Sequence, residues 1–212
     1  MSELPQPPSH ALPIELELLP VGTRLVRVHE LDRDAIDFNA ASRPLARFRP
    51  IGKPIVPTLY AGLDEDVALA EGLFHDVPIR PGLLRQYPLA GLEGRMMSEI
   101  APTRELRLIA LYGYALQRLG VTHAELIETP AAAYGWTARC AAALYAANED
   151  ADGLLWMSRR FTGRRALMLW REKRRIARGD LEINEPPRPL WEGDGRELVL
   201  RAAQRAGIRL IA

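Results

Sequence analysis

The sequence predicts an α+β fold. Segments with the alternating apolar pattern of strands and segments with helical patterns follow one another without regular strand–helix–strand alternation. Of the 212 residues, 48% are hydrophobic and 26% are charged, which provides enough apolar material for a buried core. Because no internal repeat and no long linker is present, we expect an irregular lead-in over residues 1–20 and one domain over residues 21–212.

Two strands are predicted in the first third of the chain. Residues 23–29 (TRLVRVH) alternate between apolar and basic side chains, so Arg27 faces away from Val26 and Val28. A polar, proline-broken stretch follows. Residues 55–61 (IVPTLYA) then predict a buried strand, in which Pro57 indicates either a sheet edge or the start of the strand.

A helix is predicted from Asp64 to about His75. Acidic residues occupy its first turn, where the helix dipole favours negative charge, and Pro78 prevents its continuation. At 100° per residue, four apolar side chains define the buried face, and Glu71 falls at the edge of that face. These four side chains are Val67, Ala70, Leu73 and Phe74.

The second half alternates between predicted strands and helices. Residues 130–148 predict a helix that starts with Pro130 and has an alanine-rich body. Two apolar segments joined by a short basic turn predict a β-hairpin. The predicted elements are strands at 104–111, 153–158, 165–170 and 208–212, and helices at 130–148 and 197–206.

Composition excludes several classes of protein. No uncharged apolar run reaches the roughly 18 residues that a membrane span needs, and no basic segment precedes an apolar stretch at the N-terminus. The single cysteine, Cys140, excludes an internal disulfide framework and predicts a small core residue. The four scattered histidines show no metal-ligand spacing. We therefore expect a cytoplasmic protein without a metal site.

Basic residues concentrate toward the C-terminus. Residues 1–150 carry 14 basic and 19 acidic side chains, whereas residues 151–212 carry 14 and 8. All bases except Lys53 and Lys173 are arginines, which suit phosphate and carboxylate binding but also reflect a GC-rich coding sequence. The stretch 159–178 keeps open a non-catalytic module that binds nucleic acid, although a central apolar strand and a pI of about 7.9 argue against it.

Five polar or aromatic residues are candidate site residues, and each also has a purely structural interpretation. Glu71 could be a rim carboxylate, Tyr60 a core aromatic, and Arg27 a salt-bridged strand residue. Arg47 lies in a loop that could build an anion site, and Ser158 ends a predicted strand. Position alone does not decide between these interpretations.

The order of several segments resembles the RES domain family. These are LVRVH, FNAASRPLARFRP, VPTLYAGLDEDVALAEGLFHD, TPAAAYGWTARCAAALY, DGLLWMSRR and RALMLW. The resemblance covers roughly residues 22–172 and is most specific in YAGLDEDVALAEGLFHD. RES proteins are typically toxins of bacterial toxin–antitoxin pairs, encoded beside an Xre-type helix-turn-helix antitoxin.

The resemblance implies a fold similar to the ADP-ribosyltransferase toxins, a mixed β-sandwich core with surrounding helices, and NAD⁺ as the substrate. It implies cleavage of the nicotinamide–ribose bond, with water, phosphate or a protein side chain as acceptor. By matched position, Glu71 and Ser158 would be catalytic, whereas Arg27, Arg47 and Tyr60 would bind NAD⁺.

The chemistry fits these residue types. A carboxylate such as Glu71 can stabilise the oxocarbenium-like state and hold the 2′-hydroxyl group, and Arg27 and Arg47 can clamp the diphosphate. Tyr60 offers a ring face to nicotinamide, and Ser158 can orient Glu71 or a ribose hydroxyl. The resemblance also implies an Xre-type antitoxin partner in a hetero-oligomer, with a homo-oligomer as another possibility.

Three positions depart from the family pattern. Ala46 replaces the usual glycine before Arg47, and Arg49 adds a positive charge near the expected cleft. Ser158 is followed by Arg159 and Arg160 instead of an apolar continuation, which leaves the role of Ser158 the least specified.

Overall fold

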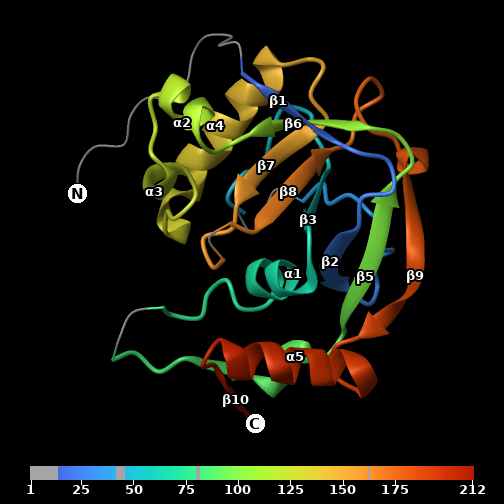
Figure 1. Ribbon diagram of the computed structural model, residues 1–212, viewed down its shortest axis with the longest axis vertical. Coiled ribbons are helices and arrows are strands. Elements are labelled where there is room, and N and C mark those ends of the chain that lie inside the picture. The colour runs from blue at the N-terminus through green and yellow to red at the C-terminus, as the bar shows by residue number, and fades with distance from the viewer. Residues whose placement is uncertain (1–13, 42–45, 80–81, 162) are drawn as a thin grey trace.

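The computed structural model describes residues 14–41, 46–79, 82–161 and 163–212 (Figure 1). The α+β class is confirmed. In chain order the elements are β1 (Leu16–Leu19), β2 (Leu25–Glu30), β3 (Thr58–Gly62), α1 (Glu65–Gly72), β4 (Gln86–Pro88), η1 (Leu89–Leu92), β5 (Arg95–Pro102), β6 (Leu106–Ala110), α2 (Tyr114–Leu119), α3 (His123–Leu126), η2 (Ala131–Ala133), α4 (Tyr134–Ala147), β7 (Gly153–Met157), β8 (Arg165–Trp170), η3 (Arg178–Asp180), β9 (Leu181–Pro189), α5 (Gly193–Arg205) and β10 (Arg209–Ile211).

One eight-stranded mixed sheet organises the fold, in the order β1-β6-β7-β8-β3-β2-β5-β9. Only the β6–β7 pair is parallel, and every other neighbouring pair is antiparallel. β10 and β4 form a separate two-stranded parallel sheet. The sheet curls, so that β5 and β9 run at a steep angle to β7 and β8 (Figure 1).

The inside of the curled sheet is a continuous apolar core. Each of the eight strands contributes at least one buried side chain to it, and the segment around Ile36 closes it. The contributing strand residues are Leu19, Leu25, Leu59, Ala61, Ile100, Leu106, Leu108, Leu155, Leu167, Leu169 and Leu181. Because the two arms of the sheet share this core, they pack face to face as the layers of a β-sandwich do.

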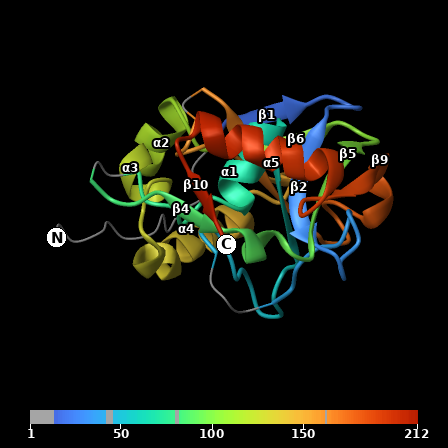
Figure 2. The same cartoon turned by 90° about the horizontal axis from the view of Figure 1, so that it is seen from below.

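The helices cover the opposite face of the sheet. α1 packs on β2, β3 and β8, and α5 lies beside α1 in both views (Figure 1 and Figure 2). Asp64 caps α1, because its carboxylate accepts a hydrogen bond from the Val67 N–H at 2.9 Å. Gly72 permits close packing, since a Cβ atom there would lie 2.9 Å from the Cβ atom of Val28. The resulting contact fixes α1 over β2.

A buried arginine supports the end of α4. Arg175 donates hydrogen bonds to the carbonyl oxygens of Tyr145, Asn148 and Ala151, at 2.6–2.7 Å. Its guanidinium also lies 4.0 Å from the centroid of the Tyr145 ring. The carbonyls of Tyr145 and Asn148 belong to the end and C-cap of α4, which lack intrahelical partners, and that of Ala151 belongs to the turn before β7.

Most predicted elements are confirmed, and the differences have physical causes. Pro57 precedes β3, which lies between β8 and β2, so the interpretation of Pro57 as an edge marker was wrong and it marks the start of the strand. β1 falls within the lead-in that was expected to be irregular over residues 1–20, of which residues 1–13 lie outside the described residues. β9 was missed because its exposed, proline-containing sequence lacks an apolar alternation, as suits an edge strand.

Candidate active site

The structure brings together the two residues predicted to be catalytic. Glu71 projects from the last turn of α1, and Ser158 directly follows β7. The Ser158 hydroxyl donates a hydrogen bond of 2.7 Å to Glu71 Oε1. Ser158 is only 2% exposed, whereas Glu71 is half-buried. The serine therefore holds one carboxylate oxygen and leaves the other free of that contact.

Two arginines extend this pair toward the end of α1. The Arg160 backbone N–H donates to Ser158 Oγ at 3.2 Å. The guanidinium groups of Arg159 and Arg160 both donate to the His75 carbonyl oxygen, and Arg160 also donates to the Val77 carbonyl oxygen at 2.7 Å. Because these carbonyls belong to the segment that follows α1, the two guanidinium groups fasten this segment to the turn between β7 and β8.

The surroundings of Arg160 are unusually unfavourable for a charged group. Burial, together with the neighbouring positive charge of Arg159, lowers the pKa of Arg160 to about 10. The Nε atoms of Arg159 and Arg160 are buried and have no hydrogen-bond partner in the described structure. Clustered cations with unused donors are typical of sites that bind anionic groups.

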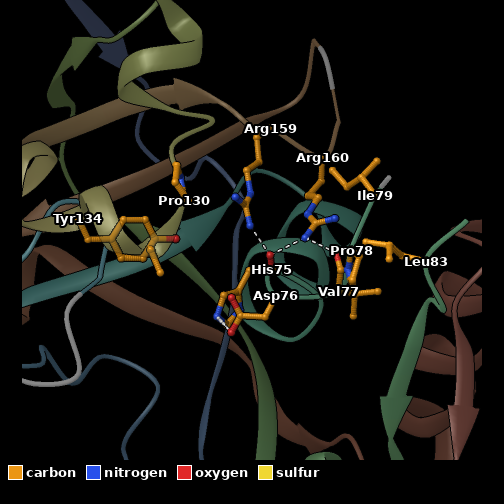
Figure 3. Close-up of a pocket in the computed structure, with 11 residues that line it drawn as sticks. His75, Asp76, Val77, Pro78, Ile79, Leu83, Pro130, Tyr134, Arg159 and Arg160 are labelled. Carbon is orange, nitrogen blue, oxygen red and sulfur yellow. Dashed lines mark hydrogen bonds and ion pairs between the residues drawn. The ribbon is translucent and has the colours of Figure 1, made fainter. Parts of the chain in front are cut away.

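These arginines border an open cavity of about 390 Å³, which we call the first cavity (Figure 3). Arg159 and Arg160 form one side, Tyr134 faces them across it, and an ion pair between His75 and Asp76 lies below. The His75 Nε2 and Asp76 Oδ2 atoms of this pair are 2.9 Å apart. The cavity thus combines an aromatic wall with a cationic wall. Glu71 and Ser158 are not among its described lining residues, and they connect to it through Arg160, whose backbone N–H donates to Ser158 Oγ.

Tyr60 and Arg47 meet on the Tyr134 side of this cavity. The Tyr60 hydroxyl accepts a hydrogen bond from the Phe48 N–H at 3.2 Å, and burial raises the pKa of this hydroxyl. The Arg47 guanidinium lies 5.8 Å from the centroid of the Tyr134 ring, and the Thr137 hydroxyl donates to the Arg47 carbonyl oxygen. Arg47 Nε and Nη1 are buried without a hydrogen-bond partner among the described residues. Tyr60 therefore anchors the loop that presents Arg47.

Arg27 lies on the other face of the sheet. Val26 packs with α1, so the next residue in the strand faces the inside of the curled sheet. There Arg27 Nη1 donates hydrogen bonds of 2.9 Å to the carbonyl oxygens of Ala35 and Asp37. Burial lowers the pKa of Arg27 to about 10. Arg27 therefore fastens the 35–37 segment to β2, and these hydrogen bonds do not join it to Glu71 or Arg47; its expected role in NAD⁺ binding stays a prediction.

A buried polar pair accompanies Arg27 on this inner face. His29 Nε2 lies 2.7 Å from Ser98 Oγ, and His29 Nδ1 lies 2.9 Å from the Glu30 carbonyl oxygen. Burial lowers the pKa of His29, and the positive charge of Arg27 acts in the same direction. The contact between His29 and Ser98 ties β2 to β5.

Sequence reasoning missed the residues that line the first cavity. Tyr134 was assigned only to a helix, and Arg159 and Arg160 were read as a departure from the family pattern. The doubled arginine directly after Ser158 was the available signal. By contrast, the charge added by Arg49 does not reach this cavity, because its guanidinium donates to the Ala41 carbonyl oxygen at 3.0 Å.

The basic stretch 159–178 does not form a continuous exposed surface. Arg165 pairs with Glu17, and Arg178 pairs with Asp34 and Asp37. Arg164 pairs with Asp64 and Asp66. Arg159, Arg160 and Arg175 bind backbone carbonyl groups. These six arginines are therefore paired with carboxylates or backbone carbonyl groups of the protein itself.

Within the part of the chain that the structure describes, no group of three or more His, Cys, Asp or Glu side chains is arranged to hold a metal ion. In the same residues, no helix combines the length and apolar character needed to span a bilayer.

Comparisons with known proteins agree with this architecture. A chain of the crystal structure of the M. tuberculosis MbcT–MbcA toxin–antitoxin complex superimposes with a TM-score of 0.57 and 17% sequence identity, covering 81% of this chain and 84% of that chain. The shared fold fits the ADP-ribosyltransferase-like architecture that the resemblance implied. No curated protein matches the sequence. The RES domain family matches residues 24–191, and the chain belongs to this family.

Proposed function

We propose that the protein is the toxin of a bacterial toxin–antitoxin system and acts by cleaving the nicotinamide–ribose bond of NAD⁺. The observation that carries this proposal is the Glu71 carboxylate, held at 2.7 Å by the Ser158 hydroxyl beside a cavity with a cationic wall. Membership of the RES domain family and the shared fold with a chain of a toxin–antitoxin complex support it.

Bond breaking places positive charge on the ribose. The electron pair of the C1′–N bond leaves with nicotinamide, which departs as a neutral base, and the ribose becomes oxocarbenium-like. The Glu71 carboxylate stabilises this charge and accepts a hydrogen bond from the 2′-hydroxyl group. Ser158 acts as a positioning residue, because its hydrogen bond fixes the rotamer of Glu71. Water or phosphate then adds to C1′.

The remaining residues hold the substrate. Tyr60 supports the loop of Arg47, whose unpartnered donors bind substrate oxygen atoms on the Tyr134 side. Arg159 and Arg160 offer cationic donors to anionic substrate oxygens on the opposite side. Arg27 contributes indirectly by ordering the 35–37 segment.

A protein that destroys NAD⁺ in the cytoplasm requires restraint. We therefore propose an antitoxin partner of the Xre helix-turn-helix type. The M. tuberculosis relative in fold was solved as a toxin–antitoxin complex, which supports an antitoxin for this chain. Co-expression with the product of the adjacent reading frame should restore growth to cells that express this chain.

Product analysis tests the reaction and its acceptor together. The purified chain is incubated with NAD⁺ in the presence and absence of phosphate, and the products are separated by chromatography. Free ADP-ribose identifies water as the acceptor, a phosphorylated ADP-ribose identifies phosphate, and label transferred to lysate proteins identifies an ADP-ribosyltransferase. If no condition releases nicotinamide, the proposed activity is refuted.

A further inference from the structure

A second cavity lies next to the proposed active site. It has a volume of about 440 Å³ and is enclosed by α1, α5 and the turn between β7 and β8. Its apolar lining includes Leu69 and Phe74 from α1 and the segment that follows it, Phe161 from the turn, and Ile208 after α5. Arg160 lines both cavities, so the two hollows adjoin across this one side chain.

The lining of the second cavity is strongly cationic. Arg85, Arg160, Arg164 and Arg205 line it, and Asp66 is the only carboxylate among its described lining residues. Asp66 pairs with Arg164 at 3.1 Å and with Arg205, which leaves an excess of positive charge. Arg85 Nε donates to the Pro78 carbonyl oxygen at 3.1 Å and has no carboxylate partner among the described residues.

An apolar, aromatic lining together with several arginines suits a ligand that has both a planar base and phosphate groups. Aromatic and aliphatic side chains offer a surface on which a planar base can pack, and guanidinium groups bind phosphate oxygens through paired donors. A volume of about 440 Å³ falls in the range of small-molecule sites and accommodates one nucleotide.

Part of the wall of the second cavity lies outside the segment that the RES domain family matches. The family match ends at residue 191, whereas Ala202, Arg205, Ala206 and Ile208 of the cavity wall lie beyond it. α5 and the residues that follow it therefore contribute a wall that the family match does not describe.

We propose that the second cavity binds a nucleoside diphosphate group, and that in catalysis this group is the adenosine-diphosphate half of the dinucleotide. The base packs against Phe74 and Phe161, and the phosphates contact the arginines, with Arg160 at the junction of the two cavities. The assignment of this group to the substrate rests on the proposed function. The role of α5 is then to complete the substrate site.

A calorimetric titration with ADP tests this proposal directly, because ADP lacks the nicotinamide–ribose bond and no catalysis is needed. The full chain is compared with the variants Arg205→Gln, Arg85→Gln and Arg201→Gln. Arg201 is the matched control, since it lies one turn from Arg205 on α5, has a 61% exposed side chain against 65% for Arg205, and does not line the cavity.

We expect the full chain and Arg201→Gln to bind ADP equally well, and Arg205→Gln and Arg85→Gln to bind it about tenfold more weakly, as the loss of a charge-assisted hydrogen bond predicts. Thermal melting verifies that each variant is folded. Absence of ADP binding, or equal affinities for Arg85→Gln, Arg205→Gln and Arg201→Gln, would overturn the proposal. Nicotinamide release by the full chain is measured separately, so failure of the proposed reaction and failure of the nucleotide site are distinguishable.

Discussion

Replacement of Glu71 by glutamine removes one charge and little else. The amide oxygen of the substituted side chain can still accept the hydrogen bond that Ser158 donates at 2.7 Å to Glu71 Oε1. Because Glu71 is half-buried, an effective dielectric constant of about 20 suits its interaction with a charge on the ribose. At a separation of roughly 4 Å the lost attraction is about 4 kcal/mol, which corresponds to a roughly 10³-fold slower chemical step.

The assay follows nicotinamide release by chromatography at saturating NAD⁺, so that kcat is measured. Glu93→Gln is the control, since it makes the same chemical change at an exposed carboxylate that follows η1, outside α1 and the turn between β7 and β8. Thermal melting confirms that both variants are folded. A Glu71→Gln rate within tenfold of the unchanged protein would refute the electrostatic role of this carboxylate.

Three further predictions concern positioning and stability. Ser158→Ala should lower kcat about tenfold with little change in KM, because the loss of one hydrogen bond loosens Glu71 without removing its charge; a change in KM alone would contradict this role. Because the pKa of His29 is lowered in the folded protein, the unfolded chain binds a proton at His29 more readily than the folded chain does. The contribution of His29 to the free energy of unfolding is therefore complete above its unfolded pKa of about 6.5 and declines as the pH falls below that value. Urea unfolding of His29→Gln should therefore show a weaker loss of stability between pH 7.5 and pH 5.5, whereas an unchanged slope would exclude His29 as a source. Arg175→Met should lower the free energy of unfolding by about 3 kcal/mol, because three carbonyl groups at the end of α4 and in the turn that follows it lose a buried donor; a change below about 1 kcal/mol would show that other donors replace it.

Local patterns predicted the elements that surround the candidate site. The alternation in TRLVRVH identified β2 and placed Arg27 opposite Val26 and Val28, as the structure does. The acidic first turn located α1, and the apolar pair of segments gave the β7–β8 hairpin. The spacing of apolar residues predicts these elements correctly, because each element buries one or both of its faces in a core on the same sheet.

Contacts between distant segments could not be read from the same patterns. The bond between Ser158 and Glu71 joins residues 87 positions apart, and their pairing was expected only from the family resemblance. Arg27 illustrates the converse. The structure places this arginine on the inner face of the curled sheet, and no local pattern encodes that curl; its assignment to NAD⁺ binding stays a prediction.

The cationic character of the site depends on how charges are neutralised across the whole chain. Sequence shows the basic stretch 159–178, but only the structure separates Arg165 and Arg178, which pair with carboxylates, from Arg159 and Arg160, which border the first cavity. The charge of this stretch kept open a nucleic-acid surface, against which its central apolar strand argued, whereas the structure places two of its arginines in a cavity wall.

The most direct test of the central claim is a crystal structure of the Glu71→Gln chain bound to NAD⁺. We predict that the nicotinamide ribose lies in the first cavity, with its C1′ and 2′-hydroxyl group in contact with residue 71 and the Ser158 hydrogen bond retained. Electron density for the dinucleotide elsewhere on the molecule, with residue 71 and the first cavity free of substrate, would contradict the account.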